Sequence, residues 1–462
     1  MELLLRTFLI AALLQGCLPL EGHQVFSITA RTYRQLQAAK DIQKELGKEV
    51  EVWPEAIFLN EPALVQVSPY VASKFEDYIQ KHGLYSEVAI ENLAEAVNDQ
   101  VARRTALGDD VLATFTFDEY HPLEEIEEWL FAIAAANPDI TEIITVGASY
   151  ELHPIFVLRV SLDINGTRPA IWMDGGIHAR EWLAPATIVY FIDTFLKNYT
   201  TDSVLSKSLE THDWYFMPVF NVDGYNFTWI EAADENGTVS MPNRLWRGTR
   251  TPIYGQADEC RGADPNRNWD KEWGTTTGVT LEPCGDNHLI YCGDSPWSEP
   301  SVRQVAFYLR DKIDLDVYFA YHMYGQMYML PYGYKEEKPE DYDEMLEICQ
   351  RGIARIKEVH GTDYRCGTLI DLVGPNSGSS VDWTYGELGV KYSFAVELRQ
   401  NATYGFTLPA DQILPNCEEN WPFVLEVVES FMDGPSSAAS SLSSLSFVIS
   451  ATFLVLNKNI GL

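Results

Sequence analysis

The strongest constraint on the fold is a set of short runs in which almost every residue is apolar. Residues 170–173 and 392–396 are two of these runs, and each is followed at once by an acidic residue. Strands that are buried on both faces of a sheet have this pattern, whereas strands with one solvated face alternate. Stretches with helical periodicity, such as residues 183–198 and 341–359, separate the runs. The alternation predicts an α/β domain with a mixed central β-sheet flanked by helices.

A smaller unit precedes this domain. Residues 31–46 and 71–82 have helical periodicity and alternate with strand-like runs, which predicts a small α/β unit over residues 23–104. The unit ends in a charged stretch that closes with Arg103-Arg104. A dibasic pair on an exposed linker is a candidate site for proteolytic processing, although two solvated charges would look the same. Its position at the end of a separate unit favours processing.

Both ends of the chain carry features of targeting signals. Residues 1–22 contain a basic n-region and an apolar stretch and end at a small residue, Gly22, which predicts a cleaved signal peptide. The apolar stretch is too short to span a membrane. Residues 434–462 combine a serine-rich spacer with an apolar run, 445–456, as a GPI-attachment signal does. The run is short and the end is polar, so a disordered tail or a poor membrane anchor is the alternative.

The chain is strongly acidic, with a formal net charge of −34 and a pI near 4.5. This balance argues against nucleic-acid binding, which needs basic patches. Solubility explains the acidity, and attraction of cationic ligands is the alternative. The acidic residues are spread along the whole chain, which favours solubility.

Sequons and cysteines support the prediction of secretion. Five N-x-S/T sequons follow the signal peptide, at Asn165, Asn198, Asn226, Asn236 and Asn401. An even number of cysteines in a secreted chain suggests disulfides, without fixing their connectivity. Six remain after the signal peptide: Cys260, Cys284, Cys292, Cys349, Cys366 and Cys417.

A histidine and a glutamate lie three residues apart where a predicted strand ends and a predicted helix follows. They are His178 and Glu181, in the segment 174–182. Ligands bind at the carboxyl ends of strands in open α/β sheets. Zn²⁺ accepts imidazole nitrogen and carboxylate oxygen, and a catalytic site uses three protein ligands and one open position. The pair alone is weak evidence, because a His and a Glu in a surface loop are the more common case, so its interpretation depends on residues further along the chain.

Four later blocks, together with 174–182, give the pair its context. They are residues 243–247, 264–269, 321–325 and 392–399. In this order the five blocks closely resemble the zinc metallocarboxypeptidases of the pancreatic A/B type, and the resemblance extends over residues 23–431. It implies an activation propeptide over 23–104 and a zinc carboxypeptidase catalytic domain over 105–433. It also implies one Zn²⁺ per chain, peptide or protein C-termini as substrates, and an activating trypsin-like protease as a partner.

The resemblance also implies roles for individual residues. It makes His178, Glu181 and His322 the zinc ligands, Glu397 the general base and acid, and Arg247 the group that holds the oxyanion. It makes Asn266 and Arg267 the clamp for the substrate carboxylate, Asp264 the acceptor for the imidazole of His178, and Arg180 and Tyr324 the lining of the upstream approach. Cys260 and Cys284 are the implied disulfide; the pairing of the other four cysteines stays open.

Two positions bear on specificity. The family usually has a mobile tyrosine nine residues before the tryptophan at 383, where this chain has Gly374. Its loss should weaken substrate binding more than chemistry. Val381 matches the base of the specificity pocket, where enzymes for basic ends have Asp and the carboxypeptidase O type has a basic residue. Burying a charged side chain against Val381 would be costly, so we expect apolar C-terminal residues to be preferred.

Two alternatives remain at this point. One is a weakly active binding protein that keeps the pocket but has lost turnover through Gly374; the retained zinc ligands and Glu397 disfavour it. The other is a carboxypeptidase of B-like or O-like specificity. The net charge is the only support for the B-like version, and the GPI-like tail is the only support for the O-like version. The expected location is the secretory pathway and then the extracellular space, either free or GPI-anchored.

Overall fold

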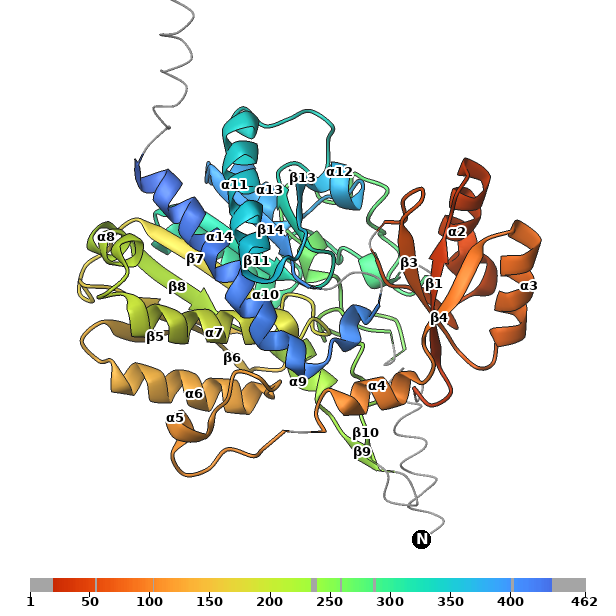
Figure 1. Cartoon of the computed structure of the whole chain (residues 1–462), viewed down its shortest axis with the longest axis horizontal. Helices are drawn as coiled ribbons and strands as arrows, with labels where there is room; N and C mark the ends of the chain where they lie inside the picture. Colours follow the sequence, from red (N-terminus) through yellow and green to blue (C-terminus); the bar gives the residue numbers. More distant parts are fainter. Residues whose placement is uncertain are drawn as a thin grey trace, which may run out of the picture.

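Two large β-sheets divide the protein into two units, which stand side by side in Figure 1. The computed structural model describes residues 20–54, 56–102, 104–233, 239–257, 260–285, 288–399 and 403–433. Most of the predicted signal peptide, Arg103, the sequons at Asn236 and Asn401, and the C-terminal tail lie outside these residues. No helix within the described ranges is long and apolar enough to cross a membrane.

The first unit, red and orange in Figure 1, is a four-stranded antiparallel sheet packed on two helices. Its strand order is β2-β3-β1-β4. The elements are β1 (Gln24–Thr29), α2 (Tyr33–Leu46), β2 (Val50–Val52), β3 (Pro62–Val67), α3 (Ala72–His82) and β4 (Tyr85–Ile90). A separate apolar core forms between sheet and helices and includes Ile28, Ile42 and Phe75. The short helices α4 (Leu93–Asp99) and α5 (Val111–Thr114) lead into the second unit.

The second unit is built on an eight-stranded mixed sheet with the order β13-β12-β14-β11-β7-β8-β6-β5. Its strands are β5 (Thr141–Ala148), β6 (Pro154–Val160), β7 (Ala170–Gly175), β8 (Asp213–Met217), β11 (Leu315–His322), β12 (Met327–Leu330), β13 (Arg365–Thr368) and β14 (Tyr392–Glu397). A two-stranded ribbon, β9 (Ala232–Ala233) and β10 (Val239–Ser240), lies apart from it.

Helices flank this sheet, as the sequence predicts. They are α6 (Leu123–Ala136), α7 (Leu183–Asn198), α8 (Ser203–Thr211), α9 (Val222–Thr228), α10 (Pro300–Lys312), α11 (Tyr342–His360), α12 (Leu369–Val373), α13 (Ser380–Gly386) and α14 (Ile413–Asp433). Short 3₁₀ turns occur at Pro265–Arg267, His288–Ile290, Gly405–Thr407 and Ala410–Gln412. Every residue of β7 and β14 is buried, because helices cover both faces of the sheet. The predicted fold class is therefore confirmed.

Three neighbouring parallel strands end at the same edge of the sheet. β11 lies between β7 and β14, and it pairs with both in parallel. His322 at the end of β11 is the register partner of Glu397 at the end of β14. Tyr321 is the partner of Gly175, which ends β7. This edge brings together sequence blocks that lie far apart in the chain.

The sequence pattern underestimates α14. Helical periodicity begins at about residue 421, whereas the helix begins at Ile413. Its first half buries polar side chains, which breaks the apolar period. Asn416 Nδ2 donates to Thr187 Oγ1 at 2.9 Å, and Asn420 Nδ2 donates to Tyr364 OH at 3.0 Å. Tertiary hydrogen bonds therefore satisfy groups that a sequence pattern assigns to the surface.

A buried ion pair fastens α14 to the segment that follows Glu397. Arg399 Nε donates to Glu419 Oε1 at 2.7 Å, and Arg399 Nη2 donates to Glu419 Oε2 at 2.5 Å. The Glu419 side chain has no exposed surface. We expect Arg399→Met to lower the free energy of unfolding by ~3 kcal/mol, because it leaves a buried carboxylate without its counter-ion. Urea unfolding measures this difference.

Arg310→Met is the matched control for this prediction. Arg310 pairs with Asp311 at 2.7 Å, but both side chains are about half exposed. An exposed pair contributes little to stability, so its loss should leave the unfolding midpoint unchanged. Equal midpoints for the two variants would contradict the structural role of the Arg399 pair.

Candidate active site

Two histidines and a glutamate form a buried cluster at the sheet edge. His178, Glu181 and His322 each have at most 2% of their surface exposed. His178 Nδ1 lies 2.7 Å from Glu181 Oε1, and His322 Nδ1 lies 3.2 Å from Glu181 Oε2. The two Nδ1 atoms are 3.2 Å apart. Two imidazole nitrogens and a carboxylate that converge in this way match the ligand set that catalytic zinc sites use, so the residues fit the metal.

The turn between β7 and α7 brings His178 and Glu181 to this cluster. A Cβ on Gly175 would lie 2.9 Å from the backbone of Ala184, so only glycine lets the strand end pack against the helix. Gly176 has a φ of +68°, a left-handed conformation that glycine adopts without strain. The two glycines of the 174–182 segment are therefore needed for the turn that places His178 and Glu181 at the end of β7.

Asp264 joins the cluster to Arg247. Its Oδ1 accepts a hydrogen bond from His178 Nε2 at 3.0 Å, and its Oδ2 accepts one from Arg247 Nη2 at 2.8 Å. Burial alone would raise the pKa of this carboxyl, but Arg247, His178 and Arg267 hold the pKa well below its usual range. Asp264 therefore stays ionised and directs Nδ1 of His178 toward the other ligands.

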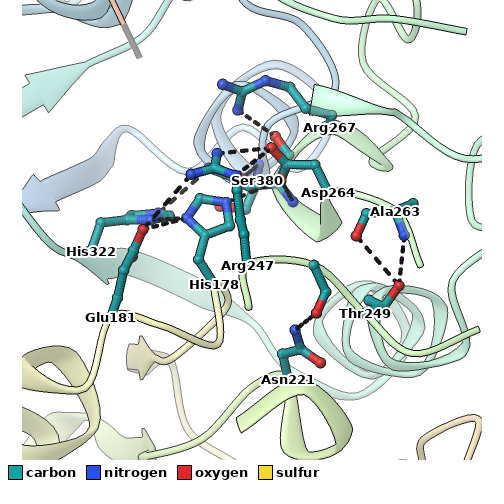
Figure 2. A network of polar contacts seen from close by, with 12 residues as sticks. His178, Glu181, Asn221, Arg247, Thr249, Ala263, Asp264, Arg267, His322 and Ser380 are labelled. Carbon is teal, nitrogen blue, oxygen red and sulfur yellow. Dashed lines mark hydrogen bonds and ion pairs between the residues drawn. The ribbon is translucent and has the colours of Figure 1, made fainter. Parts of the chain in front are cut away.

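Arg247 is held in place by its own loop, which Figure 2 shows beside the cluster. Its backbone C=O accepts from the N–H of Ala179 at 2.9 Å, and Asn221 Nδ2 donates to the C=O of Gly248 at 2.9 Å. Thr249 Oγ1 accepts from the N–H of Ala263 at 2.9 Å. Arg247 Nη1 thus comes within 4.0 Å of Glu181 Oε1, next to the ligand cluster.

Asn266 and Arg267 lie on the first 3₁₀ turn, directly after Asp264. Asn266 Oδ1 accepts from the N–H of Ser380 at 3.0 Å, and Asn266 Nδ2 lies 3.4 Å from His322 Nε2. Arg267 Nε donates to the C=O of Gly278 at 3.2 Å. The structure therefore brings both residues to the same edge as the ligand cluster and Glu397.

Arg180 and Tyr324 meet residues of the first unit and of the segment after β14. Arg180 forms an ion pair with Glu51 and places its guanidinium carbon 4.0 Å from the ring centre of Phe406. The ring of Tyr324 lies 5.1 Å from that of Phe406. The ring of Trp53, which belongs to the first unit, also lies near Phe406, with 5.3 Å between the two ring centres. A charged and aromatic contact thus joins the two units at the approach to the cluster.

The first unit covers the cluster. A cavity of about 160 Å³ is bounded by Trp53 and Phe58 on one side and by Arg247 and Glu397 on the other. A second cavity of about 430 Å³ is bounded by Ile57 of the first unit and by Arg267 and Gly374 of the second. A peptide would have to displace Trp53, Pro54, Ala56 and Phe58 to reach these groups.

The two positions singled out for specificity lie in different surroundings. Val381 is buried in α13, one residue after Ser380. Gly374 has a φ of +83°, and a Cβ at this position would lie 3.5 Å from the Cβ of Ala56. Gly374 therefore lies under the first unit.

Glu51, Trp53 and Phe406 contribute to the covered site but were not expected from the sequence. Glu51 and Trp53 belong to a strand-like run, which carries no sign of what it faces. Phe406 follows the last recognised block by seven residues and lies in a 3₁₀ turn. Contacts between two units depend on their docking, which local sequence patterns do not encode.

The structure also pairs four cysteines. Cys260 and Cys284 form one disulfide, and Cys349 and Cys366 form the other. Cys292 and Cys417 are buried and free.

A covered centre with this ligand set fits a catalytic zinc site, and comparisons with known proteins identify the class of protein. The zinc carboxypeptidase family model matches residues 126–423, and the carboxypeptidase activation peptide model matches residues 26–100. The chain belongs to the zinc carboxypeptidase family. It is a peptide hydrolase that uses one zinc ion, and its first unit is an activation peptide.

Individual relatives agree with this assignment. The chain is 35% identical to carboxypeptidase A2 of Rattus norvegicus, over 93% of this chain and 99% of that protein. It is 33% identical to carboxypeptidase A1 of Homo sapiens, over 90% and 95% respectively. The crystal structure of thrombin activatable fibrinolysis inhibitor superposes with a TM-score of 0.78 at 30% identity, covering 88% of this chain and 98% of that one.

The role of Glu397 can be tested directly by mutation. This residue ends β14 opposite His322 and is not a member of the ligand cluster. We expect Glu397→Gln to keep bound zinc and substrate affinity but to lower kcat by ~10²–10⁴, the contribution of a positioned acid or base. Zinc content by atomic absorption and steady-state kinetics on the processed chain measure the two effects. A wild-type kcat would assign proton transfer to another group.

Proposed function

We propose that this chain is a zymogen whose processed form removes apolar residues from the C-termini of peptides, with the site residues in the roles given below. The observation that carries the proposal is the convergence of three strand ends on one buried space. Glu181 of the ligand cluster, Glu397 and Arg247 all border it. Zinc held by His178, Glu181 and His322 would polarise the scissile carbonyl and lower the pKa of the attacking water.

The other residues then have distinct tasks. Glu397 accepts a proton from the attacking water and passes it to the leaving amine. Arg247 donates hydrogen bonds to the carbonyl oxygen as negative charge develops there. Asn266 and Arg267 bind the terminal carboxylate of the peptide, because a guanidinium fork and an amide match a carboxylate. This restricts cleavage to the chain end.

Gly374 removes the side chain that the family usually places over the bound peptide. We propose that the change raises KM and leaves kcat largely intact, because Glu397, Arg247 and the ligand cluster are all present. The full set of catalytic groups favours turnover over the alternative of a protein that only binds peptides.

We propose the boundaries 1–22 for the signal peptide, 23–104 for the activation peptide, 105–433 for the catalytic domain and 434–462 for a GPI-attachment signal. The composition of the two terminal segments supports secretion and attachment at the cell surface. The exposure of Asn165, Asn198 and Asn226 supports glycosylation of these sequons. Release of the protein from cells by a phosphatidylinositol-specific phospholipase tests the attachment.

Activation should depend on cleavage near Arg103-Arg104 and on the contact between Glu51 and Arg180. The intact chain should be nearly inactive, and limited trypsin cleavage should produce activity. We expect Glu51→Gln to raise the activity of the uncut chain roughly fivefold, since a hydrogen bond to a charged partner becomes one to a neutral amide. Hydrolysis of a blocked dipeptide that ends in Phe measures the activity.

Glu87→Gln is the control for this change. Glu87 lies in the same unit and accepts a hydrogen bond only from the exposed Tyr85 within it, at 2.9 Å. Its replacement should not affect the activity of the uncut chain. Full activity of uncut wild-type protein would contradict the precursor role of residues 23–104.

The preference for apolar ends rests on Val381 and on the uncharged residues expected near it, Ser379, Ser380 and Ala395. A Phe or Leu side chain gains ~1.5–3 kcal/mol from complete burial, whereas a Lys or Glu side chain would lose hydration without a partner. The net charge of −34 affects encounter rates with cationic peptides rather than fit in the pocket. We therefore expect kcat/KM to be highest for aromatic or large aliphatic ends.

Substitutions at Val381 test this reading. Val381→Asp should shift the preference toward Lys and Arg ends, and Val381→Arg toward Glu ends, because each provides the missing counter-charge. A panel of peptides that differ only in the last residue measures the change in kcat/KM. A wild-type preference for Arg or Glu over Phe and Leu would contradict the assignment of Val381 to the pocket base.

A further inference from the structure

A small cavity separates the catalytic groups from an apolar wall. Its volume is about 10 Å³, which is room for roughly one water molecule. Asn266, Arg267 and Glu397 border one side of it. If Asn266 and Arg267 hold the terminal carboxylate, as proposed above, the side chain of the last residue has to enter this space. The wall opposite is formed by Met329, Leu369, Val373, Ala395 and Asn376.

Asn376 is the one polar member of that wall. Only 3% of its surface is exposed. Its backbone N–H donates to the C=O of Gly333 at 3.0 Å, and its Nδ2 donates to the C=O of Gly374 at 3.1 Å. A carbonyl only accepts, so the second bond fixes which end of the amide is nitrogen. Oδ1 is therefore the acceptor that remains.

This oxygen is buried and has no hydrogen-bond partner among the residues that the structure describes. A Cβ on Gly333 would lie 2.3 Å from it, so the amide packs closely over a glycine that makes room for it. A buried acceptor without a donor is costly, and most such groups in proteins are satisfied by protein, water or ligand. A donor that arrives with the substrate would satisfy it.

The wall that carries Asn376 also touches the activation peptide. Val373 borders this small cavity as well as the two cavities that Trp53, Pro54 and Ala56 line, and Gly374 lies next to Ala56. Departure of the activation peptide therefore removes the support from one side of this wall. That change gives a side chain larger than a water molecule a way to enter.

We infer that Asn376 is a specificity-determining residue whose Oδ1 accepts a hydrogen bond from the terminal side chain of the substrate. The favoured end is then an apolar side chain that carries an O–H or N–H donor, rather than a purely apolar one. The inference rests on the proposed function and refines its preference for apolar ends. In this proposal, Val381 disfavours charged terminal side chains, and Asn376 selects, among the remaining ones, those that carry a hydrogen-bond donor.

Two pairs of peptides isolate this donor, one ending in Tyr or Phe and the other in Thr or Val. The members of each pair have nearly the same shape: Tyr adds a hydroxyl group to the ring of Phe, and Thr has a hydroxyl group where Val has a methyl group. On the trypsin-processed chain, we expect kcat/KM to be about tenfold higher for the peptide that ends in the hydroxyl-bearing residue than for its partner. This ratio should appear in at least one pair, the one whose hydroxyl group reaches Oδ1 of Asn376. Asn376→Ala should bring that ratio close to one, mainly through KM.

Two further variants keep the test decisive. Asn376→Asp retains an acceptor at the same place, so it should keep the ratio at or above the wild-type value even if Asn376→Ala does not fold. Ser377→Ala is the matched control, because Ser377 is the buried neighbour of Asn376, bonds to the segment at Thr275, and should leave the ratio unchanged.

Ratios near one in both pairs for the wild-type chain would overturn the inference, as would a ratio that survives Asn376→Ala or disappears in Asn376→Asp. Such results would leave Asn376 as a structural anchor over Gly333 while the carboxypeptidase activity stands. Failure of the processed chain to hydrolyse any of the four peptides would instead overturn the proposed function itself.

Discussion

The carboxylate of Asp264 holds the site together. It is fully buried between the imidazole of His178 and the guanidinium of Arg247, at 3.0 and 2.8 Å. Two partners with positive character keep it ionised in a place where burial favours the neutral acid. Because one carboxylate orients both groups, the metal-ligating face of His178 and the charge of Arg247 have fixed positions relative to each other.

The sheet provides the frame that this carboxylate needs. β7, β11 and β14 are parallel neighbours, so their carboxyl ends deliver His178, His322 and Glu397 to one edge. Asp264 and Arg247 come from loops, which are positioned by hydrogen bonds of Asn221 and Thr249 rather than by the sheet. The strand ends and the turn after β7 supply the ligand cluster and Glu397, and the loops supply Asp264 and Arg247.

The activation peptide places a charge and an aromatic ring at the approach to the cluster. Glu51 meets Arg180, and Trp53 packs on the aromatic ring of Phe406. A carboxylate and an apolar ring thereby occupy the approach to the cluster. The first unit therefore covers the cluster through contacts with residues around it.

Much of the fold and most of the site residues could be predicted from the sequence. The doubly buried runs gave β7, β11 and β14, because burial on both faces leaves a continuous apolar signature. The catalytic groups follow from the resemblance of five blocks. β12 and β13 were not predicted, because each has only four residues and a strand this short has little pattern.

Other features could not be read from the chain alone. The contact of Glu51 with Arg180 depends on how two units dock, and the buried amide of Asn376 depends on a loop that folds over Gly333. Asn416 and Asn420 belong to the same class, since their burial is compensated by partners distant in the sequence. Local patterns report exposure and period, whereas these features are properties of tertiary packing.

The most direct test of the account is to measure bound zinc and the release of the C-terminal residue together on the processed chain. The account predicts one zinc ion per chain and release of a terminal Phe. Release should stop when a chelator removes the metal and return when zinc is added back, and His322→Ala should lose both zinc and activity. Undiminished release by the zinc-free chain, or by His322→Ala, would contradict it.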